Sequence, residues 1–571
     1  MPPSAPTVSS MASMATLTGL LRRSHRHGAA TTRAARRTMT GAQGLHQQGP
    51  TTWSRCRSTL AAPLQRTDVD ALGQQGLATG QERDADWDSA KPFDEIPGPK
   101  PLPVLGNMWR FVVGDLAKVP TSDLQRRFLN DYGTIMKLCG LPGRKDLVFV
   151  FDAEAAEKVL RNEGIWPIRI GLESLGYMRS LTPEKFEDAW GLVSTQGKEW
   201  ASFRTAVNQT MMQPRNAKLY VGVIDKVSQE LIDRMRFVRD PQNVMPDDFY
   251  NELSKWALES ITYIALDRRL GCLDNNLKPD SEAQQIITAV HTIFDCLFWL
   301  DVQPSLWKVV RTPTFYRMKR TMNWFYGKVF GFIEEAMDRL KAMTPEERES
   351  HEYSVLERLL LRNDNPRIAV TMALDMVTAG VDTTSNTSAT VMYELAKNPD
   401  KQRKLQQELD RVLPDPREPV TASKLEELRY LRACIKEAMR VSPIIVGNQR
   451  MAVKDLVLCG YQIPKGTDVL CVHSEMVKEE QYFPRAREFI PERWLPEGDH
   501  LKALHPFASM PFGFGPRTCV GRRFAQLEME TFLAKAFRNF NIGWKGPPLK
   551  KELKLLYSVA SPLKFECVDR V

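Results

Sequence analysis

A short stretch near the end of the chain combines a single cysteine with glycines and an arginine. It reads Phe512-Gly-Phe-Gly515-Pro-Arg517-Thr-Cys519-Val-Gly521. Cys519 is followed directly by a helix-like run, and its thiolate is better suited to bind iron than to form a disulfide. Gly515 permits a tight turn against a flat macrocycle, and Gly521 lets the backbone approach closely. We therefore predict that Cys519 binds a haem iron and that Arg517 reaches a haem carboxylate.

The complete spacing F-x-x-G-x-R-x-C-x-G resembles the haem-binding loop of the cytochrome P450 family. The resemblance implies that Cys519 is the axial ligand of haem b. The other haem-binding residues of the loop are then Phe512, Gly515, Arg517 and Gly521. A thiolate ligand favours cleavage of the O–O bond of dioxygen. The alternative interpretation, a buried structural cysteine in a glycine-rich loop, leaves the other positions unexplained.

A long helix is predicted over residues 367–398, ending before Pro399, with polar residues at its centre. The central sequence is Ala379-Gly380-Val-Asp382-Thr383-Thr384. Glycine inside a helix costs about 1 kcal/mol relative to alanine, so the Ala-Gly pair indicates clearance for a flat group and a small ligand. An aspartate in an apolar helix is also costly without a purpose.

This central sequence resembles the oxygen-activating helix of the family, [AG]-G-x-[DE]-T-[TS]. The resemblance implies that Thr383 keeps a hydroxyl and a water in hydrogen-bonding geometry at the oxygen, and that Asp382 supplies protons. Gly380 belongs to the same catalytic set, and Ala379 lines the substrate site. For Thr384, a hydrogen bond back to the preceding turn is the expected arrangement.

Trp200 and Arg204 are four residues apart on a predicted helix, so both can donate to one acceptor. The pattern W-x-x-x-R is weak alone, and an exposed arginine beside a core tryptophan is the alternative. The resemblance assigns this pair to one haem propionate and Arg450 to the other. It also implies that Ile444, Ile445 and Val446 line the substrate site.

A predicted helix over residues 425–441 carries Glu437 and Arg440, which are neighbours at i and i+3. Such a pair is usually a weak surface contact. Here Pro491-Glu-Arg493-Trp494 follows, and the order resembles the Glu/Arg/Arg triad that holds the haem loop in the family. Residues 165–196 are too long for a simple connection, and by resemblance they cover the distal face of the haem.

The basic charge of the chain is confined to its start. Residues 1–67 contain nine arginines and no lysine, aspartate or glutamate, and the net charge of the 571 residues is +9. The remainder is therefore balanced, and we expect no nucleic-acid partner. An Arg-rich, acid-free start is typical of a mitochondrial transit peptide, and a disordered basic tail is the alternative. We expect a leader over 1–67, an acidic linker over 68–92 and a catalytic domain over 93–571.

Four basic residues could form a patch on the thiolate side of the haem: Arg432, Lys436, Arg522 and Arg523. Solvated surface charge is the alternative interpretation. The segment 265–273 resembles the mitochondrial branch of the family, most of all its arthropod members. The four positions match the site where that branch binds an adrenodoxin-like [2Fe–2S] ferredoxin, which is reduced by an NADPH-dependent ferredoxin reductase.

Residues 286–330 mix aromatic and basic side chains. The aromatic set is Phe298, Trp299, Trp307, Phe315, Tyr316, Trp324, Phe325 and Tyr326. This mixture suits contact with the surface of the inner mitochondrial membrane on its matrix side, and burial in the core is the alternative. No stretch in the first 110 residues approaches the ~20 apolar residues of a membrane span.

Together these patterns predict a mainly α fold of the cytochrome P450 type. A large helical domain and a small β-rich N-terminal subdomain are expected, with the haem between the oxygen-activating helix and the cysteine loop. The implied activity is hydroxylation of a lipophilic substrate, steroid-like or foreign, with dioxygen and NADPH-derived electrons. The alternatives are a haem-thiolate isomerase or dehydratase and a non-catalytic haem or ligand carrier.

Overall fold

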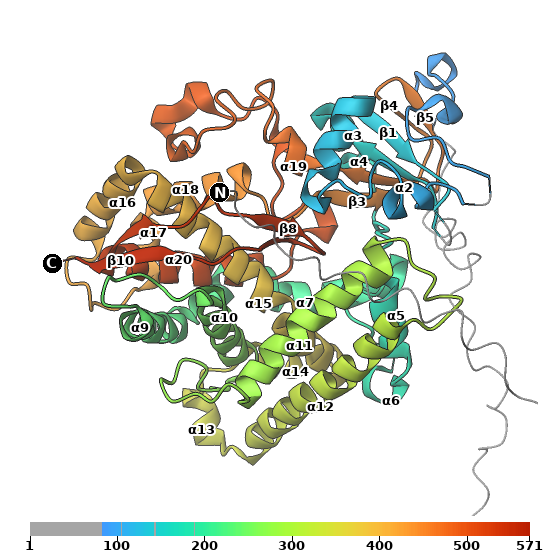
Figure 1. Ribbon diagram of the computed structural model, residues 1–571. Coiled ribbons are helices and arrows are strands. Elements are labelled where there is room, and N and C mark those ends of the chain that lie inside the picture. The colour runs from blue at the N-terminus through green and yellow to red at the C-terminus, as the bar shows by residue number, and fades with distance from the viewer. Residues whose placement is uncertain (1–82, 104, 142–143, 188, 571) are drawn as a thin grey trace, which may run out of the picture. The chain divides into compact units, whose positions relative to one another are not determined.

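The computed structural model describes residues 83–103, 105–141, 144–187 and 189–570 (Figure 1). The expected leader and most of the expected linker lie outside these residues. The described end of the linker contacts the domain that follows it. Asp84 accepts a hydrogen bond of 2.6 Å from the backbone N–H of Val457 and pairs with Lys158 at 2.7 Å. The boundaries of leader and linker stay predictions.

One sheet joins strands from the two ends of the described chain. Its order is β1 (Ile135–Leu138), β2 (Leu147–Val150), β6 (Asp468–Cys471) and β3 (Asn448–Met451). β2 and β6 run parallel with Val148 opposite Val469, whereas the other two pairs are antiparallel. This sheet, with α3 (Leu124–Tyr132) and α4 (Ala153–Arg161), lies at the upper right of Figure 1.

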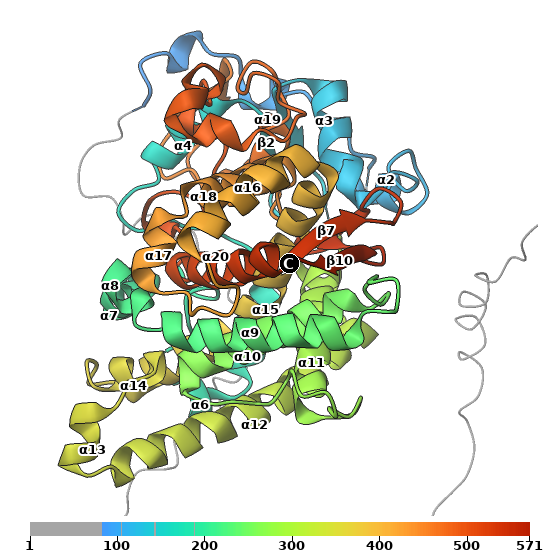
Figure 2. The same cartoon turned by 90° about the vertical axis from the view of Figure 1, so that its left-hand side faces the viewer.

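The longest helix, α15 (Pro366–Lys397), runs through the middle of the helical region. Asn365 caps its start by accepting from the backbone N–H of Arg367 at 2.9 Å, and Pro366 suits the first turn. α15 packs against α10 (Phe249–Leu266), α18 (Arg429–Val441) and α20 (Arg522–Asn539). In Figure 2, α20 crosses the centre between α18 above and α9 (Val221–Val238) below. The fold thus places the cysteine loop beside the central helix.

The other helices and strands surround this centre. The helices are α2 (Met108–Val112), α5 (Glu173–Ser180), α6 (Pro183–Phe186), α7 (Gly197–Met212), α8 (Pro214–Lys218), α11 (Glu282–Leu297), α12 (Pro313–Ala342), α13 (Pro345–Ser350), α14 (Val355–Leu360), α16 (Pro399–Val412), α17 (Ala422–Glu427) and α19 (His473–Met476). The strand pairs are β4 (Leu456–Leu458) with β5 (Tyr461–Ile463), β7 (Phe540–Trp544) with β10 (Phe565–Asp569), and β8 (Lys551–Leu553) with β9 (Tyr557–Val559).

The predicted mainly α fold is confirmed, with two local differences. The helix expected over 425–441 is broken at Leu428, whose ψ of 69° is not helical, so it forms α17 and α18. The segment 165–196, expected to be irregular, contains the short helices α5 and α6. Both differences depend on backbone turns that apolar periodicity does not reveal.

Within the described residues, one helical stretch passes a length and composition test for crossing a membrane. It is Glu282–Val302, and half of its most apolar window is buried inside the protein. That burial is also typical of a core helix.

Candidate active site

The cysteine loop ends at the start of α20. Gly513 and Gly515 have φ values of 75° and 67°, and the backbone N–H of Cys519 donates to the carbonyl of Phe512 at 2.8 Å. The backbone N–H groups of Gly521 and Arg522 point to the Cys519 sulfur. Burial raises the pKa of the Cys519 thiol, and these N–H groups together with nearby arginines oppose the rise. The residue nevertheless keeps accessible surface.

The two glycines predicted to face a macrocycle differ in what surrounds them. A Cβ on Gly515 would lie 2.0 Å from Oε1 of Glu163, so this glycine is required by its left-handed φ and by a protein neighbour. The expected reason for Gly515, clearance for a macrocycle, stays a prediction beside this one. A Cβ on Gly521 would meet no described protein atom within 4 Å. The space beside Cys519 therefore accepts an added group.

Four arginines gather next to this loop. The pKa of Arg517 is lowered to about 8, first by burial and then by the charges of Arg169, Arg450 and Arg204, while Glu163 acts against these effects. Glu163 is itself paired with Arg450. Four buried or half-buried cations with one paired carboxylate are costly unless further anions bind there. The donor set therefore fits a ligand with carboxylates, such as the two propionates of haem.

Arg517 also holds the loop over residues 165–196 in place. Its guanidinium donates to the carbonyls of Pro167 and Thr195 at 2.9 and 3.1 Å and to the side chain of Gln196 at 2.7 Å. It stacks on Trp200 of α7 at 4.0 Å from the ring centre. The sequence predicted a haem contact for Arg517, which stays a prediction, and did not indicate this link between loops.

The two other arginines that were predicted to bind propionates are both buried. Arg204 is on α7 one turn after Trp200, and its Nε has no hydrogen-bond partner among the described residues. An unpaired buried N–H group is a donor available to a ligand. Arg450 of β3 pairs with Glu163 and donates to the carbonyl of Phe514 at 3.2 Å. Arg450 thus ties the sheet to the cysteine loop.

The centre of α15 has an accessible face although most of the helix is buried. Ala379 is exposed and Thr383 is half-buried. The Thr383 hydroxyl donates to the carbonyl of Ala379 at 2.8 Å, and the Thr384 hydroxyl donates to Glu528 at 3.2 Å. The expectation for Thr384 was therefore wrong, because a carboxylate of α20 is within reach of its hydroxyl. It is Thr383 that bonds back to the preceding turn.

Gly380 has a packing role that the sequence did not indicate. A Cβ there would lie 2.9 Å from Cγ1 of Ile261 on α10. The glycine therefore allows α10 and α15 to pack closely, in addition to any role in leaving space for a ligand. Asp382 is buried, and Nε2 of His291 on α11 is 2.8 Å from its Oδ1.

The three residues of the predicted triad come together in the interior. Arg440 donates to Glu437 at 2.8 and 2.9 Å, and Arg493 donates to it at 2.9 Å. All three are buried, so the surface-pair alternative does not apply. Trp494 Nε1 and the backbone N–H of Ile490 also donate to Glu437. This carboxylate joins α18 to the segment before the cysteine loop.

The predicted substrate-lining residues Ile444, Ile445 and Val446 are half-buried. Ile444 accepts a hydrogen bond from the backbone of Tyr557, and Val446 accepts one from Ser474. This apolar segment is thereby fixed between β9 and α19.

The predicted basic patch is formed by α18 and α20, which pack together. Lys436 and Arg523 are exposed, whereas Arg432 and Arg522 are half-buried. Arg432 donates to the carbonyls of Leu425 and Glu426. The exposed charges of the patch are therefore Lys436 and Arg523.

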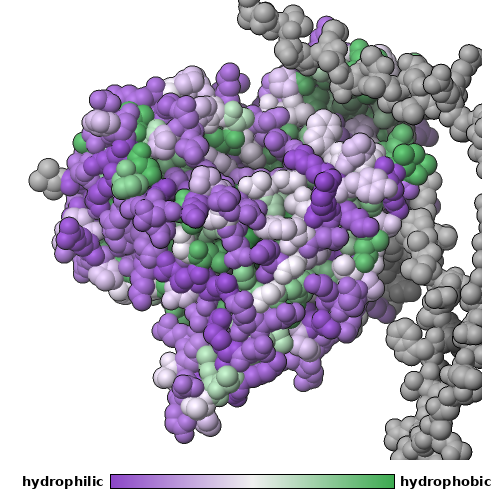
Figure 3. Space-filling view, turned by 60° about the horizontal axis from the view of Figure 1, so that its bottom comes forward, coloured by the Kyte–Doolittle hydropathy of each residue, from purple (hydrophilic) through white to green (hydrophobic). Residues whose placement is uncertain are grey.

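Most of the aromatic residues predicted to contact a membrane belong to the core. Phe298, Trp307, Phe315, Phe325 and Tyr326 are buried. The exposed large hydrophobic residues of this region are Trp299, Val302, Leu306, Val309, Val310 and Tyr316, with Val309 84% exposed. The apolar surface is thus the connection between α11 and α12. On the face drawn in Figure 3, hydrophilic residues predominate and hydrophobic ones form small separate patches.

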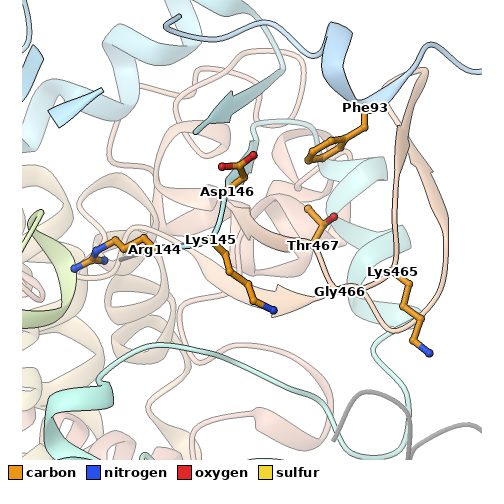
Figure 4. Close-up of a pocket in the computed structure, with 7 residues that line it drawn as sticks. All are labelled: Phe93, Arg144, Lys145, Asp146, Lys465, Gly466 and Thr467. Atoms are coloured by element: carbon orange, nitrogen blue, oxygen red, sulfur yellow. The ribbon is translucent and has the colours of Figure 1, made fainter. Parts of the chain in front are cut away.

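A cavity of about 420 Å³ lies beside the sheet and does not include these site residues. Its lining is Phe93, Arg144, Lys145, Asp146, Lys465, Gly466 and Thr467. In Figure 4, Arg144 and Lys465 point away from each other. The cavity therefore lacks a convergent set of polar groups.

Sequence reasoning missed Arg169, Glu163 and His291. Each acts on a site residue that is distant in the chain: Arg169 and Glu163 on Arg517, and His291 on Asp382. None stands in a motif with a recognisable spacing. Cys272, for which the sequence indicated no role, is buried, and its backbone N–H donates to Glu259 at 2.9 Å. The Glu259 carboxylate thereby holds the segment 269–272 in place.

Comparisons with known proteins identify the family of the chain. The cytochrome P450 family model matches residues 96–566. The probable mitochondrial cytochrome P450 301a1 of Drosophila melanogaster is 38% identical over 493 residues, 84% of this chain and 88% of its own length. The mitochondrial cytochrome P450 12b1 of Drosophila acanthoptera is 38% identical over 90% of this chain and 97% of its own. Cytochrome P450 CYP12A2 of Musca domestica is 38% identical over 88% and 96%. The chain therefore belongs to the cytochrome P450 family and is a monooxygenase.

Proposed function

We propose that this monooxygenase works in mitochondria with haem b and a [2Fe–2S] ferredoxin, and that it hydroxylates a lipophilic substrate. The observation that carries the proposal is the position of Cys519 at the start of α20 beside four arginines. A sulfur that faces N–H groups and an excess of cations suits a thiolate ligand and a dicarboxylate macrocycle. The word "mitochondrial" in the names of two of the relatives supports the location.

Five residues would hold the cofactor. Cys519 would bind the iron, and the propionates would meet cations from Arg169, Arg204, Arg450 and Arg517. Bound haem supplies the activation of dioxygen. The protein contributes the orientation of the ligand and the neutralisation of its carboxylates, since the described carboxylate next to the cluster is already paired with Arg450.

On the α15 side of this site, groups of the chain itself would bind water and transfer protons. The accessible Thr383 hydroxyl can accept and donate a hydrogen bond when its bond to Ala379 is exchanged. Asp382 directly precedes Thr383 in the same helix and can pass a proton toward that hydroxyl. Ile444 and Val446 present apolar surface that excludes water and favours a lipophilic substrate.

The electron donor would be an adrenodoxin-like ferredoxin, reduced in turn by an NADPH-dependent reductase. Lys436 and Arg523 are exposed on α18 and α20, two helices that pack together, and α20 directly follows the cysteine loop. An exposed basic surface attracts an acidic partner and speeds a transient encounter. The protein would therefore accept electrons on the cysteine side of the site.

Contact with the matrix face of the inner membrane would involve the apolar connection between α11 and α12. It carries Val302, Leu306, Val309 and Val310 on the surface, and Lys308 and Arg311 lie among them. This combination suits an interface with anionic lipid. Replacement of both Val309 and Val310 by serine should reduce sedimentation with anionic liposomes, and unchanged sedimentation would contradict the membrane contact.

One reconstitution tests the proposed function. The purified chain with haem should give the reduced carbon-monoxide difference spectrum of a thiolate-ligated haem, and Cys519→Ser should lose it. Oxygen consumption with NADPH should then require both ferredoxin and its reductase. Turnover with a hydroperoxide but without electrons would support the isomerase alternative, and a thiolate spectrum without any turnover would support a carrier.

A further inference from the structure

One oxygen of the buried Asp382 carboxylate has no aligned hydrogen-bond donor. Only 6% of the residue is exposed, and Oδ1 has no hydrogen-bond partner among the described residues. The main-chain carbonyl of Asp382 accepts from Asn386 at 2.9 Å, but this contact does not involve the carboxylate. A buried ionised carboxylate without a donor is strongly unfavourable. A neighbouring group is therefore needed to hold it.

His291 on α11 is that neighbour. Its Nε2 is 2.8 Å from Oδ1 of Asp382, a contact distance, although the ring is not aligned for a hydrogen bond. Terminal carboxylate torsions are broad, so a small rotation of Asp382 aligns the two groups. The imidazole ring also stacks on Tyr250, with ring centres 6.2 Å apart.

Tyr250 in turn is fixed by α15. The side chain of Asn386 donates to the Tyr250 hydroxyl at 2.7 Å, and Asn386 Oδ1 accepts from the backbone N–H of Val559 at 2.9 Å. Burial raises the pKa of Tyr250, and the charge of Asp382 raises it further, which places the phenol near that carboxylate. The imidazole is thus held by a supported ring rather than by a mobile surface chain.

We propose that His291 is a positioning residue for proton delivery: its Nε2–H donates to Asp382 and sets the direction in which the carboxylate faces Thr383. The proposal rests on the proposed role of Asp382 as proton source. The donor is on α11 and the acceptor on α15, so correct proton delivery depends on how these two helices pack. No proton leaves His291 in this role; the imidazole contributes a hydrogen bond.

Two substitutions separate the effect of the hydrogen-bond donor from the effect of side-chain volume. Glutamine places an amide N–H near the position of Nε2, whereas leucine fills the space without a donor. With 7-ethoxycoumarin as probe, His291→Leu should divert electrons from product to hydrogen peroxide and lower product formation about tenfold, the factor for loss of a hydrogen bond to a charged group. His291→Gln should restore most of the product. Equal loss in both variants, or no loss in either, would overturn the proposal.

A second pair provides the control. His351 Nε2 is 3.1 Å from Oε2 of Glu357 on α14. Both residues come well before Asp382 in the chain. His351→Leu also removes an imidazole beside a carboxylate, and it should leave the partition between product and peroxide unchanged. If leucine at 291 prevents haem loading, His291→Ala replaces it as the variant without a donor.

Unfolding in urea gives a readout that does not depend on turnover. The free energies of unfolding of the wild type, His291→Leu, Asp382→Asn and the double variant form a cycle. A coupling between the two sites is expected. A second cycle that starts from His291→Gln in place of the wild type should show it as well. Additive effects would overturn the contact. If the wild-type chain shows no ferredoxin-dependent turnover while the coupling is present, the proposed function fails but the positioning contact does not.

Discussion

Glu528 is a buried carboxyl group whose ionisation should make stability depend on pH. It lies on α20 with 2% of its surface exposed, and the Thr384 hydroxyl donates to it at 3.2 Å. Its other oxygen has no partner among the described residues. Burial raises the pKa of Glu528 from 4.5 to about 8, and the hydrogen bond from Thr384 opposes the rise. Glutamine has nearly the same shape and cannot ionise.

The sign follows from the two pKa values. The unfolded chain releases this proton near pH 4.5 and the folded protein near pH 8, so the folded state binds more protons in between. The free energy of unfolding therefore falls as the pH rises through this window. From about pH 5 to about pH 7.5 the loss is about 3 kcal/mol. Glu528→Gln should gain about that much relative to wild type over the same interval.

The assay compares unfolding of the two haem-loaded proteins at both pH values. For about 490 folded residues, 3 kcal/mol corresponds to a Tm difference of about 3 °C. The Tm of Glu528→Gln minus that of wild type should increase by this amount between the acidic and the neutral sample at one scan rate. A difference that stays constant with pH would refute the burial argument. Urea midpoints should change in the same direction.

Three further substitutions test other parts of the structure. Gly515→Ala should destabilise the protein by about 1–3 kcal/mol because of its left-handed φ, and its Cβ would meet Glu163; thermal unfolding checks this, and an unchanged Tm would contradict it. Glu437→Gln should cost about 3–5 kcal/mol, since it leaves two buried arginines without their carboxylate; urea unfolding and haem content measure the loss. Lys436→Glu should keep the haem spectrum and sharply weaken ferredoxin-supported turnover; the charge reversal Lys341→Glu on α12 is the control, and equal effects of both would rule out a specific patch.

The sequence was sufficient where a function leaves its residues close together in the chain. The cysteine loop, the centre of α15 and the pair Glu437 and Arg440 each stand within one turn or one helix, so their spacing, together with the family resemblance, marked them as candidates. The helix over 367–398 was also predictable, because its apolar run ends at an Asn-Pro step.

Contacts across the chain could not be read in this way. Arg169, His291 and Glu528 acquire their roles from residues more than 90 positions away, and nothing in their own neighbourhoods marks them. The glycines show the same limit. Gly380 faces Ile261 and Gly515 faces Glu163, so the need for glycine was predictable but the neighbour that causes it was not.

The parallel pairing of β2 with β6 has a consequence for biosynthesis. Val148 is opposite Val469, so nearly all of the helical region is made between the two strands. β2 leaves the ribosome long before its partner, and until then one of its edges is unpaired and apolar. Such an edge is prone to associate with other chains, and long-range pairing is slow. A chain stopped before residue 468 should therefore aggregate through β1 and β2, even with α15 complete.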